Sequence, residues 1–221
     1  EISKFDVGSL NKLTRYGRRF LNQRSLENQK IPKLSELLEL SSKNLSQASI
    51  INLEIKSTPD EKNLTPSPKE MVQIVLNDIK KSNLQDKIII SSFDWRILRE
   101  VKNQNPEISR AYLTFQQEKG MKIKKTIYSK SPWIDHIPLT IVYDLPKIIK
   151  ELGGSAWHPY YKDINKKAVK DAHDYNLPVN VWTVNDEYNM LKMIEYEVDG
   201  IMTDYPLKLK ELCEKKKIKW F

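Results

Sequence analysis

Two residues of opposite charge, Glu54 and Lys56, stand two positions apart at the end of a short apolar run. Residues 50–56 predict a β-strand, and side chains two apart on a strand point to the same face. A carboxylate is the kind of oxygen ligand that a hard cation such as Mg²⁺ or Ca²⁺ prefers. The spacing thus places a candidate metal ligand beside a cationic donor, although spacing alone favours a structural ion pair.

Three further side chains stand where predicted strands end: Ser92, Asn185 and Trp182. A parallel barrel exposes polar groups at such positions, so Ser92 and Asn185 are candidate substrate contacts. Both residue types are equally common at helix starts. An indole can line a binding site, but a core tryptophan is about as common.

The chain has three histidines, and we expect none of them to be catalytic. His158 lies at a predicted strand end and is interpreted as a structural histidine with its partners satisfied. His173 and Asp174 fall within a helical run and predict an exposed pair on a helix. His136 lies in a long loop and is uninformative.

Composition predicts one globular domain over residues 1–221, with no membrane span. The net charge of +8 favours anionic partners, but the charges are scattered, so we expect no nucleic-acid binding. Lys215, Lys216 and Lys217 are expected at a solvated helix end. The single cysteine, Cys213, excludes an internal disulfide. Because the chain opens with Glu1, we expect that upstream sequence has been removed.

Helical and strand patterns alternate along the chain. A helix is expected at 34–42, and the apolar face of the next one is expected to hold Met71, Ile74, Val75 and Ile79. Strands are expected at 50–56, 87–90, 111–115, 155–158, 179–184 and 200–203, each followed by a helix, with a long excursion at 116–143. This alternation predicts a parallel sheet covered by helices, but periodicity does not distinguish an open sheet from a barrel.

Residues 31–38 (IPKLSELL), 52–56 (NLEIK) and 91–94 (SSFD) are similar, in this order, to elements of one family, the glycerophosphodiester phosphodiesterases. Residues 181–185 (VWTVN) and 199–206 (DGIMTDYP) match its carboxyl-terminal signature. Residues 5–8 (FDVG), followed by Tyr16, Gly17 and Phe20, resemble a Tyr-Asp-Val-Gly element of a bacterial branch.

The resemblance implies a TIM-type (β/α) barrel of which this chain forms the third to eighth β/α units, incomplete at the amino end. In the family, a His-Arg-Gly motif, a Glu-x-Asp metal pair and a His-Asp motif lie upstream of the Tyr-Asp-Val-Gly element. Here no histidine precedes His136, so no catalytic residue can be assigned. Six strands would also leave two edges exposed, favouring aggregation or a partner that carries the missing units.

The resemblance gives the remaining candidates their roles. Glu54 matches a metal carboxylate, which implies a divalent cation, Mg²⁺ or Ca²⁺. Lys56 resembles the family's phosphate-contacting lysine, and Trp182 resembles the aromatic on the glycerol side of the site. Ser92 and Asn185 are secondary candidates for binding substrate.

The implied function is hydrolysis of small-molecule glycerophosphodiesters to glycerol 3-phosphate and an alcohol, at a very low rate in this chain alone. A non-catalytic remnant or phosphate-binding module of the same fold is the alternative. A nucleic-acid binder is supported only by the net charge. The bacterial branch is often exported, so periplasmic and cytoplasmic locations both remain open.

Overall fold

The computed structural model describes residues 1–61, 64–118, 124–140 and 143–219. The chain divides into two compact units, Glu1–Asn44 and Leu45–Phe221. A single domain over residues 1–221 stays a prediction.

The first unit has little regular structure before its helix. It contains two short 3-10 turns, η1 (Ile2–Lys4) and η2 (Gly17–Phe20), and then α1 (Leu34–Asn44). The Glu36 carboxylate accepts a hydrogen bond from the backbone N–H of Lys33 at 2.7 Å, which satisfies one donor at the start of α1. The predicted helix is confirmed and extends two residues further.

The second unit alternates strands and helices, as the sequence predicts. Its strands are β1 (Ile51–Glu54), β2 (Ile88–Ser92), β3 (Ser109–Thr114), β4 (Ala156–Pro159), β5 (Asn180–Val181) and β6 (Gly200–Ile201). Its helices are α2 (Pro68–Ser82), α3 (Trp95–Gln104), α4 (Leu145–Glu151), α5 (Lys166–Asp174), α6 (Glu187–Glu195) and α7 (Pro206–Lys215). Short 3-10 turns lie at η3 (Gln85–Lys87), η4 (Pro132–Ile134) and η5 (Tyr161–Asp163).

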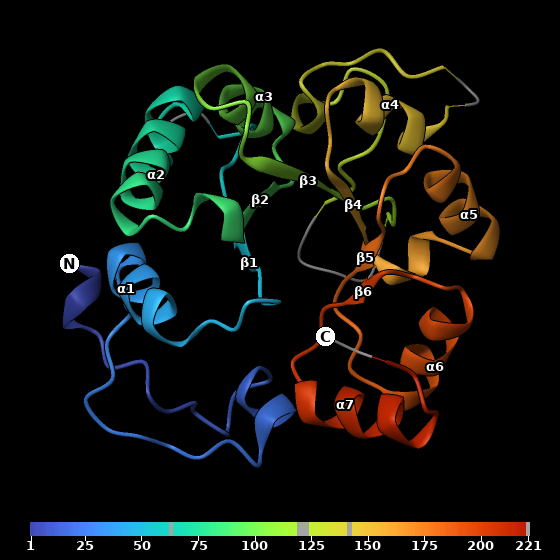
Figure 1. Cartoon of the computed structure of the whole chain (residues 1–221). Coiled ribbons are helices and arrows are strands. Elements are labelled where there is room, and N and C mark those ends of the chain that lie inside the picture. Colours follow the sequence, from blue (N-terminus) through green and yellow to red (C-terminus); the bar gives the residue numbers. More distant parts are fainter. Residues whose placement is uncertain (62–63, 119–123, 141–142, 220–221) are drawn as a thin grey trace. The chain divides into compact units, whose positions relative to one another are not determined.

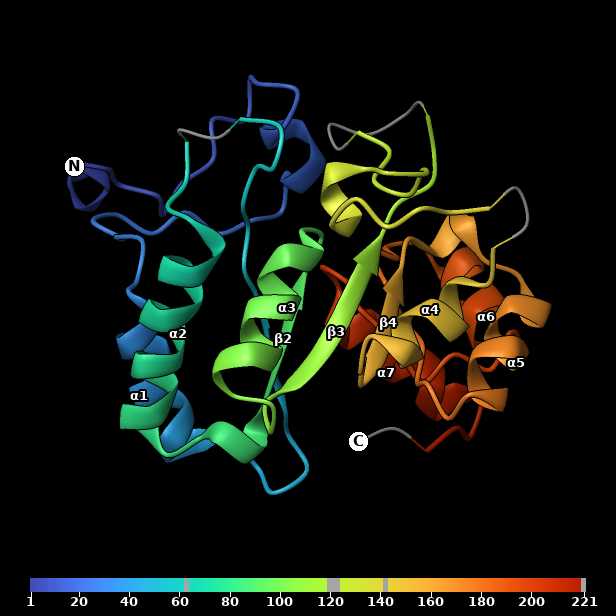
Figure 2. The ribbon, with the colours of Figure 1, turned by 90° about the horizontal axis from the view of Figure 1, so that it is seen from above.

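The strands are parallel and follow one another in chain order. β1 to β4 form one ladder and β5 with β6 another, and the bridges Trp157 to Val179 and Tyr160 to Trp182 join β4 to β5. Helices α2 to α7 lie around the outside of the strands (Figure 1), and β2, β3 and β4 follow one another in chain order when seen from above (Figure 2). The Asn52 amide of β1 contacts Met202 Sδ, just after β6, at 3.8 Å, so the sheet curves as a barrel does.

The outer edges of β1 and β6 carry no partner strand within the described part of the chain. None of the helices described is long and apolar enough to cross a bilayer.

Alternation along the strands separates two faces. On β3, Tyr112 points outward against Trp95 of α3, with ring centroids 5.0 Å apart. Leu113 and Phe115 point inward, where they form a buried cluster with Tyr160 and Trp182. The inner face of the sheet therefore carries an aromatic core contributed by the ends of several strands.

Helix α2 differs from the expectation in the face it buries. Ser67 and Glu70 form the capping box that starts it, but Val72 and Ile79 are buried while Ile74 is 60% exposed. Positions 72 and 79 lie two turns apart on one side of a helix, and position 74 is rotated by about 200° from position 72. The predicted face was therefore wrong at Ile74.

Candidate functional site

Glu54 and Lys56 meet at the carboxyl end of β1. Lys56 Nζ lies 2.5 Å from Glu54 Oε1, and the intervening Ile55 is buried, with its N–H donating to the Ser91 carbonyl at 2.9 Å. The two charged side chains thus share one face, as the period of two predicts. Their side chains are 29% and 76% exposed, respectively, so the pair is open to solvent and to a ligand.

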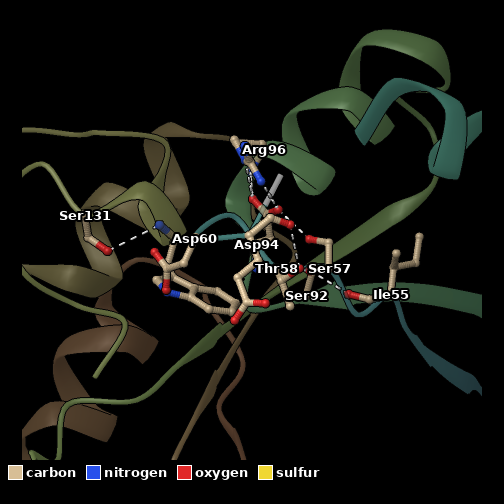
Figure 3. A network of polar contacts seen from close by, with 10 residues as sticks. Ile55, Ser57, Thr58, Asp60, Ser92, Asp94, Arg96 and Ser131 are labelled. Carbon is tan, nitrogen blue, oxygen red and sulfur yellow. Dashed lines mark hydrogen bonds and ion pairs between the residues drawn. The ribbon is translucent and has the colours of Figure 1, made fainter. Parts of the chain in front are cut away.

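A second polar cluster, which we call the buried network, lies at the carboxyl ends of β1 and β2. It comprises Ser57, Ser92, Asp94 and Arg96, and Figure 3 shows Asp94 between Arg96 and Ser57. Asp94 accepts two hydrogen bonds from the Arg96 guanidinium, at 2.9 and 2.7 Å, and one from Ser57 Oγ. Asp94 also caps α3 through the backbone N–H of Arg96 at 3.1 Å.

Ser92 belongs to the buried network. Its hydroxyl donates to the Ile55 carbonyl at 2.8 Å and accepts from the Asp94 N–H at 3.1 Å. A hydroxyl has one donor, and here that donor is used to link β2 to the segment after β1. The structure therefore places Ser92 next to the Glu54–Lys56 pair but in a buried, structural position.

Trp182 lies in the aromatic core on the inner face. Its Nε1 donates to the His158 carbonyl at 2.8 Å, and its ring meets Phe93 edge-on with centroids 5.2 Å apart. The Tyr160 ring lies at the same centroid distance from Trp182. The pKa of the Tyr160 phenol is raised to about 12, mainly by burial. Because an indole has a single donor, Trp182 can offer a ligand only its ring.

Asn185 joins the two halves of the carboxyl-terminal signature. Its Oδ1 accepts from Thr203 Oγ1 at 3.1 Å and from the Asp204 N–H at 2.9 Å, while its Nδ2 donates to the Asp204 carboxylate at 2.7 Å. These contacts fix the chain between β6 and α7 against the end of β5. Asn185 therefore stabilises the loop between β6 and α7.

His158 lies inside the sheet, and burial lowers its pKa to about 4, so the ring is neutral at pH 7. Its Nε2 lies 3.0 Å from Asn180 Nδ2, whereas Nδ1 has no hydrogen-bond partner in the described chain. The prediction of a fully satisfied histidine therefore holds for only one of the two ring nitrogens. It helps to line a cavity of about 350 Å³ with Asn52, Ile89 and other residues of the strands.

The other two histidines lie on the surface. His173 Nε2 is 2.8 Å from the Asp199 carboxylate, and the neighbouring Asp174 pairs with Lys170 instead. His136 Nδ1 lies 3.2 Å from the Lys130 carbonyl. The predicted exposed position of His173 is confirmed, but its acidic partner is not the adjacent residue.

Sequence reasoning missed the buried network. Asp94 stood in a recognised Ser-Phe-Asp segment but was given no role, and Arg96 was not singled out. A signal was present, since an aspartate directly before an apolar helical run is typical of an N-cap. The contact from Ser57 comes from the segment after a different strand, β1, and leaves no local trace.

The described residues alone offer few ligands for a cation. No group of three or more His, Cys, Asp or Glu side chains within residues 1–61, 64–118, 124–140 and 143–219 is arranged to hold a metal ion. Glu54 supplies one carboxylate, which is already paired with Lys56.

Known proteins of similar sequence and structure give the family. Residues 1–208 match the model of the glycerophosphoryl diester phosphodiesterase family. A glycerophosphodiester phosphodiesterase of Caldanaerobacter subterraneus subsp. tengcongensis is 30% identical over 216 residues, which are 97% of this chain and 70% of that protein.

Two solved structures show the same fold. A protein of Silicibacter pomeroyi DSS-3 assigned to the same enzyme class is 33% identical with a TM-score of 0.84, over 100% of this chain and 68% of its own. A phosphodiesterase of Oleispira antarctica is 23% identical with a TM-score of 0.62, over 90% of this chain and 65% of its own. The chain belongs to the glycerophosphoryl diester phosphodiesterase family.

Proposed function

We propose that this chain forms the phosphate-binding side of a glycerophosphodiester phosphodiesterase, as the third to eighth β/α units of its barrel. The reaction is hydrolysis of a glycerophosphodiester to glycerol 3-phosphate and an alcohol. The observation that carries the proposal is the solvent-open Glu54–Lys56 pair at the carboxyl end of β1. The Oleispira antarctica protein was solved with sn-glycerol-3-phosphate as its product, which supports this substrate class.

Lys56 is the residue that we assign to the phosphate. Its ammonium group is 76% exposed and is held near the sheet by Glu54, so it can contact a phosphate oxygen without leaving a buried partner unpaired. Trp182, which is 7% exposed in the aromatic core, is the proposed contact for the glycerol carbons. Ser92 and Asn185 hold the segments after β1 and β6 through their contacts within the protein.

Glu54 is proposed as one ligand of a divalent cation, Mg²⁺ or Ca²⁺. Such a cation would offset the phosphate charge, but such ions usually take six or more ligands in total, waters included. The described residues offer a single carboxylate here, so they do not fit a complete cation site. We propose that further ligands come from β/α units that this chain does not contain.

We assign no residue of this chain to proton transfer. Cleavage of a phosphodiester needs a base for the nucleophile and an acid for the leaving alkoxide, each of which contributes about 10²–10⁴-fold. His158 is buried, and His136 and His173 contact Lys130 and Asp199 on the surface. We therefore propose that the chain alone binds product and hydrolyses substrate very slowly.

Titration calorimetry with sn-glycerol 3-phosphate tests the binding role, and Lys56→Gln should weaken binding about ten-fold through loss of a charge-assisted hydrogen bond. Lys167→Gln is the matched control, because Lys167 also forms an exposed ion pair with a carboxylate, that of Asp171 at 2.6 Å, on α5. Equal affinities for the two variants, or no binding by the unmodified chain, would exclude the assignment of Lys56.

Turnover separates the enzyme from the alternative, a phosphate-binding module. Glycerophosphocholine is incubated with the chain in Mg²⁺ or Ca²⁺, and release of glycerol 3-phosphate is measured. Cation-dependent turnover that is lost in Glu54→Gln would show that the chain is sufficient for catalysis and would refute the predicted inactivity. Binding with very slow turnover is the result we expect.

A further inference from the structure

The first unit carries a concentration of positive charge that its family assignment does not explain. Residues 7–26, here called the basic loop, contain five basic residues and no acidic one, a net charge of +5 out of the chain's +8. These residues are Lys12, Arg15, Arg18, Arg19 and Arg24, and all five are exposed. Basic and acidic residues nearly balance in the rest of the chain, so five of the eight net positive charges come from this segment of 20 residues.

The basic loop is closed at its base. The N–H of Val7 donates to the Gln29 carbonyl at 2.8 Å, and the N–H of Leu26 donates to the Gly8 carbonyl at 2.9 Å. The two chain arms approach so closely that a Cβ on Gly8 would lie 1.8 Å from the Leu26 carbonyl oxygen. Only glycine fits at that position, so the loop has a defined neck.

Asp6 reinforces this neck. Its carboxylate accepts hydrogen bonds from the N–H groups of Gly8, Asn28 and Gln29, at 2.9, 2.7 and 3.1 Å. These bonds, led by the one from Gly8, lower the pKa of Asp6. The Phe-Asp-Val-Gly segment thus holds the two ends of the basic loop together.

The middle of the basic loop is ordered by contacts of its own. Lys12 Nζ donates to the Leu21 carbonyl at 2.8 Å, and the N–H of Gly17 donates to Thr14 Oγ1 at 2.9 Å. The Arg19 guanidinium lies 5.8 Å from the centroid of Tyr16 and 5.5 Å from that of Phe20. Cations and aromatic rings are therefore held together within one short segment.

Apolar side chains on the basic loop are exposed beside these cations. Leu13 is 87% exposed, Leu21 58% and Tyr16 55%, with Val7 and Leu26 close to half exposed. Singly exposed leucines are common on proteins, but several exposed apolar side chains within one cationic loop of 20 residues offer apolar area to a partner.

The cations of the basic loop also lack protein counter-ions. No carboxylate of the described chain lies within ion-pair distance of any of the five. Lysines elsewhere, such as Lys167 and Lys170, pair with an aspartate one helical turn away. The positive charge of the basic loop is thus available to an external anion.

We propose that the basic loop docks this protein onto the surface of an anionic lipid bilayer. Arginine and lysine heads would contact lipid phosphates while Leu13, Leu21 and Tyr16 enter the interface between headgroups and acyl chains. Exposed leucines have no use in contacts with a nucleic-acid backbone, which is bound mainly through phosphates. This docking is independent of the Glu54–Lys56 site and so of the proposed function.

Vesicle flotation measures the proposed docking. The whole chain is mixed with phosphatidylcholine vesicles that contain either no phosphatidylglycerol or about 30% of this anionic lipid, which gives the surface the negative potential that attracts basic segments. We expect binding to the anionic vesicles alone, with a steep fall as salt rises.

A matched pair of variants separates the basic loop from net charge. Arg15, Arg18 and Arg19 are changed together to Gln in one variant, and Lys215, Lys216 and Lys217 are changed together to Gln in the other. Both lose three charges from exposed positions. At about five-fold per cation, the arginine variant should lose about 100-fold in vesicle affinity, whereas the lysine variant should stay within about five-fold of the unmodified chain.

A second variant tests the apolar part without changing charge. Leu13→Ser combined with Leu21→Ser should weaken binding about ten-fold, and most visibly at high salt, where the electrostatic part is screened. Three results would overturn the proposal: no binding to anionic vesicles, equal losses in the arginine and lysine variants, or tighter binding to duplex DNA than to vesicles in a gel shift at the same salt.

Discussion

Two polar clusters lie at the carboxyl ends of β1 and β2, and they differ in how they are exposed. The Glu54–Lys56 pair is open to solvent, with the lysine 76% exposed. In the buried network, Asp94 has no exposed side-chain surface, and each of its carboxylate oxygens has partners within the protein. Position at a strand end thus does not by itself make a residue functional, because a side chain whose donors and acceptors are used internally has little left for a ligand.

The comparison predicts opposite consequences for mutation. A buried, hydrogen-bonded charge is costly to disturb, whereas an exposed ion pair contributes little to stability. Changes in the buried network should therefore lower stability, and changes in the exposed pair should lower ligand binding with almost no loss of stability.

Asp94→Ala should have the largest effect and lower the free energy of unfolding by about 3 kcal/mol. The change removes the cap of α3 and leaves Arg96, whose side chain is only 26% exposed, without its carboxylate. Urea denaturation measures the loss. Asp94→Asn is the control. Asparagine keeps the cap of α3, so the free energy of unfolding of this variant should fall by about 1 kcal/mol less than that of Asp94→Ala. A loss below about 1 kcal/mol in Asp94→Ala would mean that the network is not structural.

His158 extends the comparison to the inner face through the pH dependence of stability. Burial depresses its folded pKa to about 4 from an unfolded value of 6.5, so the unfolded state takes up the proton first. The stability due to the neutral ring is complete above about pH 6.5 and is lost as pH falls towards 4, a change of about 3 kcal/mol.

The measurement is the difference between the unmodified chain and His158→Gln in denaturant unfolding from pH 7 to pH 4. The unmodified chain should lose about 3 kcal/mol more than this variant over that range. His173→Gln, which removes an imidazole from the surface, is a control for the loss of any histidine. Parallel curves for the unmodified chain and His158→Gln would contradict the neutral, buried state of His158.

Ser92 and its neighbour Ser91 give a matched test of the buried network. Both side chains are completely buried, but Ser92 Oγ has two partners, whereas Ser91 Oγ has none in the described chain. Ser92→Ala should cost about 1–2 kcal/mol, since it leaves a buried carbonyl and N–H without a partner. Ser91→Ala should be neutral or stabilising in the same unfolding assay. Equal losses of stability in the two variants would show that burial, and not hydrogen bonding, determines the effect.

The fold followed from the sequence further than the site did. Apolar runs separated by capped helices place six parallel strands in order, and alternation places Glu54 and Lys56 on one face. These are local patterns, carried by residues a few positions apart. The error at Ile74 arose because α2 carries apolar side chains on more than one side, so the period alone did not identify the buried face.

The environment of the other site candidates could not be predicted in this way. Ser92 binds a carbonyl 37 residues away, Trp182 one 24 residues away, and Asn185 contacts Asp204, 19 residues further along the chain. Such partners are brought together only by the packing of strands and loops. Sequence therefore identified these residues as polar or aromatic strand ends without showing that their donors are used internally.

The exposed pair should show the smallest stability effect. A double-mutant cycle of Glu54→Gln and Lys56→Gln should give a coupling energy of about 0.5 kcal/mol or less, because solvent screens the pair and two side chains must be ordered to form it. The same variants are expected to weaken binding of sn-glycerol 3-phosphate, so function and stability should separate at this pair. A coupling energy of 2 kcal/mol or more, a size expected only for a desolvated pair, would instead make Glu54 and Lys56 part of the structural scaffold. The contrast with Asp94 would then disappear, and with it the reason for assigning Lys56 to the phosphate.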